Sequence, residues 1–264
     1  MWTVLDRTIC FVKRNIMAYV SYDGTDFHGW QAQEGIRTVQ GVIESALQRI
    51  FKKHINVQGA GRTDKGVHAR KQVITFYIPP SSIDVEGIKH AMNANLPEDI
   101  YVWQTMEVDE SINARFSAYK RIYHYYIWQD EDIDLFKRKY VWWFPHPLDI
   151  EVIRRSAIYL EGEHDFSSFR PMKDDKKTVR TLDRIRIILY PHCLLMRFEA
   201  RSYLRSMVRT LVGTLVNVGR GIWEPERLKW IVDARDRSQA GPTAPPNGLF
   251  LYDVLYPKRP KNAD

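Results

Sequence analysis

The segment 59–70, GAGRTDKGVHAR, is a candidate catalytic or ligand-binding site. Basic residues and glycines flank its one carboxylate, Asp64. A GxxxxGK[ST] phosphate loop is excluded because Val67 and His68 follow Gly66, and GxGxxG is excluded because Asp64 takes the place of its third glycine. Two interpretations remain. One is a tight surface turn at Asp-Lys-Gly. The other is a loop that presents an ionised carboxylate to a ligand, with Arg62 beside it to keep it charged and aimed. The residues alone leave the reaction open.

The elements that must position this loop follow a β-α-β-β-α-β order. Alternating apolar residues predict strands, and apolar residues at helical spacing after Thr38, a candidate N-cap, predict a helix. The expected elements are a strand at 15–23, a helix at 38–53, strands at 54–61 and 72–78, a helix at 84–93 and a strand at 99–108. This order is typical of a ferredoxin-like unit.

A second cycle of the same kind begins near residue 113. Its expected elements are strands at 121–128, 182–190 and 193–200, helices at 149–162, 203–219 and 225–235, and a closing strand at 249–257. We therefore predict an α+β fold of two ferredoxin-like halves, residues 1–112 and 113–264, with a mostly antiparallel sheet and an active-site cleft between them. The stretches 130–138, 170–181 and 237–248 are polar or rich in Pro and Gly, and we expect surface loops there.

Composition favours a polyanionic partner. Lys+Arg exceed Asp+Glu by 39 − 32, which gives the net charge of +7 over 264 residues. Cys10 and Cys193 form no CxxC pattern, so we expect neither a disulfide framework nor a cysteine zinc site. With no signal-peptide pattern and no apolar run near the roughly 20 residues that span a bilayer, we expect a cytoplasmic protein without membrane contact. The Glu163-His164-Asp165 run is no metal site in our interpretation, because adjacent side chains diverge on an extended segment.

Six segments in order resemble the TruA family of tRNA pseudouridine synthases, over nearly the whole chain from about residue 15 to residue 257. GRTDKGVHA resembles the family signature. The others are YDGTDFHGWQAQ (22–33), TVQGVIESAL (38–47), ARFSAYKRIYHYYI (114–127), GEHDFSSF (162–169) and YLRSMVRTLVG (203–213).

The resemblance implies a role for four residues. Asp64 is expected to be the nucleophile. Tyr123 is expected to stack on the flipped base and to remove a proton late in the reaction. Arg209 is expected to pair with the aspartate or a substrate phosphate, and Arg62 to lie near Asp64 and contact the RNA backbone. The implied reaction is isomerisation of uridines 38, 39 and 40 in the tRNA anticodon arm, by a homodimer that a tRNA bridges, without a cofactor.

Three arginines lie along the helix expected at 203–219 and just before it. Arg201, Arg205 and Arg209 fall four apart, so on a helix they would line one flank and could bind RNA, or form a solvated edge. We interpret His68 and His124 as structural or RNA-facing. Three rival activities stay open: a non-catalytic RNA-binding protein, a glycosidase acting on C1′, and a pseudouridine synthase with another RNA target.

Overall fold

The computed structural model describes residues 13–171 and 177–257. The first half of the chain forms two helices and four strands in the expected order. They are β1 (Arg14–Tyr22), α1 (Val39–Phe51), β2 (Gln58–Gly59), β3 (His68–Ile78), α2 (Val85–Asn95) and β4 (Ile100–Val108).

The second half repeats this order with additions. Its strands are β5 (Lys120–Trp128), β6 (Trp142–Trp143), β7 (Gly162–Asp165), β8 (Val179–Tyr190), β9 (Cys193–Ala200) and β10 (Leu249–Leu255). Its α-helices are α3 (Ile150–Ala157), α4 (Met207–Gly219) and α5 (Arg227–Ala234). Short 3₁₀ turns occupy Ile158–Leu160, Ser167–Phe169, Arg237–Gln239 and Pro246–Gly248.

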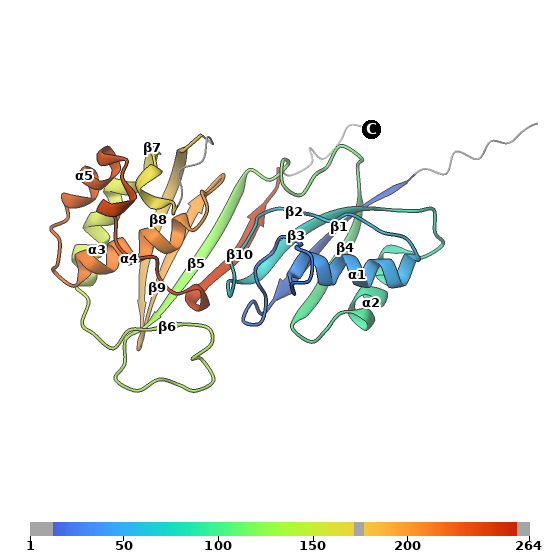
Figure 1. Cartoon of the computed structure of the whole chain (residues 1–264), viewed down its shortest axis with the longest axis horizontal. Coiled ribbons are helices and arrows are strands. Elements are labelled where there is room, and N and C mark those ends of the chain that lie inside the picture. Colours follow the sequence, from blue (N-terminus) through green and yellow to red (C-terminus); the bar gives the residue numbers. More distant parts are fainter. Residues whose placement is uncertain (1–12, 172–176, 258–264) are drawn as a thin grey trace, which may run out of the picture.

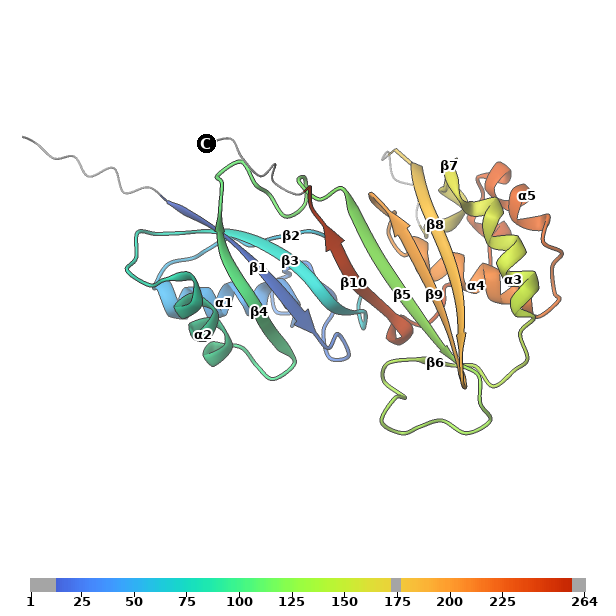
Figure 2. The ribbon, with the colours of Figure 1, turned by 180° about the vertical axis from the view of Figure 1, so that it is seen from behind.

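Within the described residues, ten strands form one mixed and mostly antiparallel sheet in an α+β fold. Eight of the strands follow the order β4-β1-β3-β10-β5-β9-β8-β7, while β2 pairs with β3 and β6 with β5. The two halves arrange their strands alike, because in each half the first strand lies between the fourth and the third. These strands are β4-β1-β3 in the first half and β10-β5-β9 in the second. In Figures 1 and 2, α1 and α2 lie beside the N-terminal strands, whereas α3, α4 and α5 gather beside the C-terminal ones.

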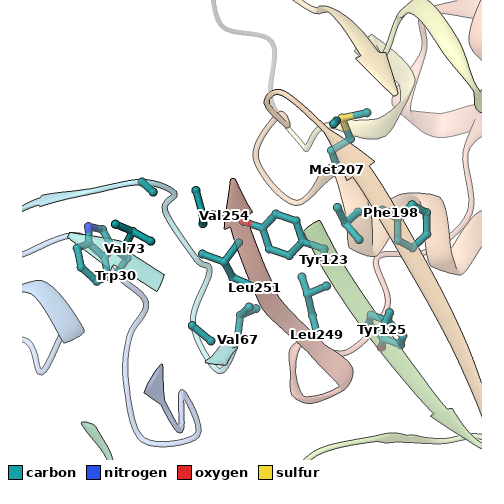
Figure 3. Packing of buried hydrophobic residues seen from close by; sticks show 14 of the residues in the cluster. Trp30, Val67, Val73, Tyr123, Tyr125, Phe198, Met207, Leu249, Leu251 and Val254 are labelled. Atoms are coloured by element: carbon teal, nitrogen blue, oxygen red, sulfur yellow. The ribbon is translucent and has the colours of Figure 1, made fainter. Parts of the chain in front are cut away.

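Strand β10 joins the two halves. It pairs in parallel with β3, through Phe250 with His68 and Leu251 with Ala69, and antiparallel with β5 along most of its length. Figure 3 shows Leu249, Leu251 and Val254 of β10 between Val67 and Val73 on one side and Tyr123 and Tyr125 on the other. These residues are buried, so one apolar core continues across the junction.

Two predicted elements are shorter than expected for reasons that the structure shows. The strand expected at 54–61 shrinks to Gln58–Gly59 because side chains of α1 capture the backbone of Val57. Glu44 accepts its N–H at 3.0 Å and Gln40 donates to its carbonyl at 3.2 Å. The helix expected from residue 203 begins only at Met207, because Ser206 has φ 54°, a left-handed conformation that ends helical geometry.

Two further elements differ from their expected bounds: α3 ends at Ala157 where the helix was expected to reach residue 162, and β3 begins at His68, four residues before its expected start. The remaining predicted elements lie close to their expected bounds. Thr38 caps α1 as predicted, since its hydroxyl accepts the Gly41 N–H at 3.4 Å. Of the predicted loop at 170–181, strand β8 takes the part from Val179 onward. The N-terminal dozen residues with Cys10, and most of the basic tail 257–261, lie outside the described residues; Cys193 is a free thiol. No helix in 13–171 or 177–257 is long and apolar enough to cross a membrane.

Candidate active site

Asp64 lies on a tight turn between β2 and β3. The Val67 N–H donates to the Asp64 carbonyl at 3.1 Å, and Gly66 sits between them at φ 77°, which a glycine adopts without steric cost. The Tyr22 hydroxyl, at the end of β1, bonds the Thr63 hydroxyl at 2.8 Å. The turn is therefore anchored to the central strands on both sides of the carboxylate.

The segment 23–30 holds this turn from outside. The Trp30 N–H donates to the Thr63 carbonyl at 3.0 Å, and the Gly66 N–H donates to the Phe27 carbonyl at 3.2 Å. A β-carbon at Gly24 would lie 2.0 Å from the Val67 carbonyl oxygen, so no side chain fits there. The YDGTDFHG motif thus has a glycine at position 24 because the backbone there packs directly against the backbone of Val67.

The Asp64 carboxylate meets two partners from the second half of the chain. Ser206 Oγ donates to Oδ2 at 2.8 Å, and an Nη of Arg209 donates to the same oxygen at 3.2 Å. Arg209 is fixed in turn, because its Nε donates to the Ala244 carbonyl at 2.7 Å. The side chain of Asp64 is 25 % exposed and that of Arg209 is 16 % exposed. The carboxylate is therefore both oriented and reachable.

The other arginines stand apart from the carboxylate. Arg62 is exposed and has no hydrogen bond or ion pair among the described residues, so Arg209 holds Asp64 in the way the sequence suggested for Arg62. The predicted flank of three arginines along one helix is wrong. Arg201 follows β9 and Arg205 lies in the turn before α4, both exposed, because the left-handed Ser206 delays the helix. Only Arg209 lies on α4.

Tyr123 faces the Asp64 loop from β5. Its ring is 7 % exposed and packs edge-on against Tyr203 at a centroid distance of 5.0 Å. In Figure 3 its hydroxyl points toward the N-terminal half, and a β-carbon at Gly61 would lie 3.6 Å from it. Burial raises the pKa of the Tyr123 phenol above its usual range, and the charge on Asp64 adds to this effect. The phenol is therefore neutral in the free enzyme.

Two histidines that could have been bases are structural. His68 is 1 % exposed, stacks on Phe250 with centroids 4.7 Å apart, and accepts the Gly24 N–H at 3.0 Å. His124 stacks on Tyr252 at 3.6 Å. Both project from their strands on the side opposite Tyr123 and Leu251, since side chains alternate between the faces of a sheet.

That opposite face carries a pocket of about 690 Å³. Aromatic residues dominate its lining, with Arg70 and Lys137 among them; Trp103, Tyr126, Phe250 and Tyr252 form much of the wall. It is separated from Asp64 by the sheet and takes no part in the site described above. No group of three or more His, Cys, Asp or Glu side chains suited to a metal occurs in the described ranges.

Sequence reasoning missed two contributors to the site. Ser206 holds Asp64 across a separation of 142 residues, and no local pattern marks it. Arg121 is buried and donates to the carbonyl of Ala60, just before the signature loop. Its place two residues before Tyr123 on the same face of β5 is the one signal that could have pointed to it.

An α+β fold with a turn-borne carboxylate, a paired arginine and a buried tyrosine is suited to an enzyme that uses a carboxylate in catalysis. A family model described as tRNA pseudouridine synthase matches residues 18–117 and 156–257, and the chain belongs to this family. It is therefore an isomerase. The chain is similar over most of its length to proteins named tRNA pseudouridine synthase A.

Three such relatives define the similarity. Identity is 53 % over 244 residues with the Thermotoga neapolitana protein, covering 92 % of this chain and 100 % of the relative. It is 55 % over 237 residues with that of Thermosipho melanesiensis, covering 89 % and 97 %. It is 51 % over 244 residues with that of Thermotoga maritima, covering 92 % and 100 %.

Proposed function

We propose that this tRNA pseudouridine synthase isomerises uridine to pseudouridine at positions 38, 39 and 40 of the tRNA anticodon arm, with Asp64 as the nucleophile. In this reaction the bond from C1′ to N1 of uracil breaks, a bond from C1′ to C5 forms, the C5 proton leaves to solvent and N1 takes up a proton. The observation that carries the proposal is the Asp64 carboxylate, held by Ser206 and Arg209 yet still accessible. Such a carboxylate can stabilise or trap an electron-poor C1′.

The neighbouring side chains take complementary roles in the proposal. Arg209 and Ser206 hold the Asp64 carboxylate in one orientation through hydrogen bonds to its Oδ2. Tyr123 stacks on the extruded base. The raised pKa of its phenol supports a neutral stacking and hydrogen-bonding role while the base is bound; removal of the C5 proton would require the phenol to lose its own proton first. No cofactor is needed, because the isomerisation involves no net oxidation.

RNA binding is proposed to depend on shape and backbone charge. The target uridines lie in a stem and at its loop edge, so each must leave its stack to reach Asp64. Arg62, Arg201 and Arg205 are exposed and lie in the segments that carry Asp64 and Ser206, and guanidinium groups are suited to phosphate oxygens. The net charge of +7 supports this.

We further infer that the sheet consists of two ferredoxin-like halves, residues 1–112 and 113–264, and that RNA enters a cleft between them. The matching strand orders of the two halves support this division. We propose a cytoplasmic homodimer bridged by one tRNA. Leu135 and Phe136, 71 % and 87 % exposed beside the aromatic pocket, support a self-association surface. Sedimentation analysis of wild type and Phe136→Ser tests this, and a wild-type monomer at assay concentration would refute it.

The experiment for the activity uses tRNA labelled with tritium at uracil C5. We expect tritium release to water while the base stays attached to RNA, with no release by Asp64→Asn and tRNA affinity within a few-fold of wild type. Normal turnover by Asp64→Asn would remove Asp64 from its role, and free uracil would indicate a glycosidase. Mapping the modified nucleotides decides between anticodon-arm uridines and another RNA target.

A further inference from the structure

Arg121 is a buried cation at the centre of the molecule. The residue is 7 % exposed, and its guanidinium donates only to backbone carbonyls. Two nitrogens reach Ala60 at 3.2 and 2.9 Å, and one nitrogen reaches both Ala118 at 3.1 Å and Arg201 at 2.7 Å. A further bond goes to the carbonyl of Arg115.

These four carbonyls belong to three separate segments of the chain. Ala60 begins the signature loop and precedes Asp64 by four residues. Residues 115 and 118 lie in the connection between the halves. Arg201 directly follows β9 and begins the segment that carries Ser206 and leads into α4 with Arg209. One side chain thus binds both the segment with the carboxylate and the segment with its two partners.

The chemistry of the contact requires an arginine. Five N–H donors in a planar fork can serve several carbonyls at once, whereas a lysine ammonium has three donors at a single point. No carboxylate forms an ion pair with Arg121 in the described part of the chain. Burying a cation whose only partners are carbonyl dipoles costs desolvation free energy, and an apolar side chain would fill the same space without that cost. Packing alone therefore does not explain Arg121.

We infer that Arg121 is a positioning residue for the reaction: by binding the Ala60 and Arg201 carbonyls together, it sets the distance between Asp64 and the Ser206–Arg209 pair. Arg121 also lies two residues from Tyr123 on the same face of β5, so the same anchor fixes the tyrosine relative to the carboxylate. The inference rests on the proposed role of Asp64.

The test compares Arg121→Met, which keeps the apolar stem, with Arg121→Lys, which keeps the charge. Arg14→Met is the matched control, because Arg14 also donates to a carbonyl, that of Ile83 at 2.7 Å, but lies far from the site. We expect the rate of single-turnover tritium release to fall about 100-fold in Arg121→Met, because a shift of a catalytic group by about 1 Å has an effect of this size. The tRNA affinity of the variant should stay within a few-fold of wild type. Arg121→Lys should recover part of the rate, and Arg14→Met should match wild type.

A double-mutant cycle separates positioning from general destabilisation. If Arg121 acts by placing Ser206 and Arg209 against Asp64, Arg121→Met should slow a Ser206→Ala enzyme by a much smaller factor than it slows wild type. Equal factors in both backgrounds would overturn the inference, as would a wild-type rate in a folded Arg121→Met. If Arg121→Met does not fold, Arg121→Lys decides: a reduced rate at wild-type melting temperature supports the inference, and an unchanged rate overturns it. Turnover by Asp64→Asn would instead refute the proposed site.

Discussion

Replacing Ser206 by alanine removes one of the two groups that hold Asp64. Its hydroxyl donates to the carboxylate at 2.8 Å, and hydrogen bonds to charged groups contribute about 1.5–3 kcal/mol. Because the Asp64 side chain is 25 % exposed, water replaces part of the lost contact, and we take the lower end of this range. A loss of about 1.5 kcal/mol in the transition state corresponds to a rate lower by roughly tenfold.

The assay is single-turnover tritium release from C5-labelled tRNA at saturating enzyme, with tRNA affinity measured separately. We expect the rate of Ser206→Ala to fall roughly tenfold at unchanged affinity, because the hydroxyl orients the carboxylate and does not touch the RNA backbone in our proposal. A wild-type rate would show that Arg209 alone suffices and would refute the reasoning.

Ser206→Gly is the control for backbone strain. The residue has φ 54°, which is unfavourable by about 1–2 kcal/mol for a residue with a β-carbon, whereas glycine loses about 0.4–1 kcal/mol through its freer unfolded chain. Ser206→Gly should therefore be more stable than Ser206→Ala by up to about 1.6 kcal/mol in urea unfolding, and equally slow. Recovery of the wild-type rate in the glycine variant alone would assign the effect to strain.

Two further substitutions test the surrounding structure. Gly24→Ala places a β-carbon 2.0 Å from the Val67 carbonyl oxygen, so we expect a loss of roughly 2 kcal/mol or more in unfolding free energy together with slower turnover, whereas Gly41→Ala within α1 should leave the rate unchanged. Burial, with the nearby charge of Arg197, lowers the pKa of His124 to about 4, below the 6.5 of an exposed histidine. Between these values the unfolded chain binds more protons than the folded one, so stability should fall as pH drops from 6.5 toward 4, by up to about 3 kcal/mol, and urea titrations of His124→Phe should lack this part of the pH dependence.

The sequence predicts most of the fold because its elements are locally encoded. The apolar spacing of α1, its Thr38 cap and the alternation in β1 and β10 depend on neighbours a few residues away, and each appears at nearly its expected bounds. Where a distant side chain intervenes, local pattern fails. The sequence around Val57 predicts a strand, but the backbone of Val57 forms hydrogen bonds with the side chains of Glu44 and Gln40 of α1.

The same difference between local pattern and distant contact applies to the residues of the site. Asp64, Tyr123 and Arg209 have roles that the family resemblance implies. Ser206 and Arg121 lie in the same motifs as Arg209 and Tyr123, but their roles become visible only through contacts with segments far away in sequence. The left-handed conformation of Ser206 has no signal in its residue type, since serine adopts it rarely. For that reason the arginines at 201 and 205 were expected on a helix that starts after them.

The position of β10 has a consequence for the order in which the protein is made. Residues 249–255 follow every other described strand in the chain, yet they fill the place between β3 and β5 at the middle of the sheet. Until then, each half of a nascent chain exposes an unpaired strand edge at the place where the other must join. We therefore expect the enzyme to become active only after β10 has been synthesised, and chains that terminate before residue 249 to be inactive and prone to aggregate.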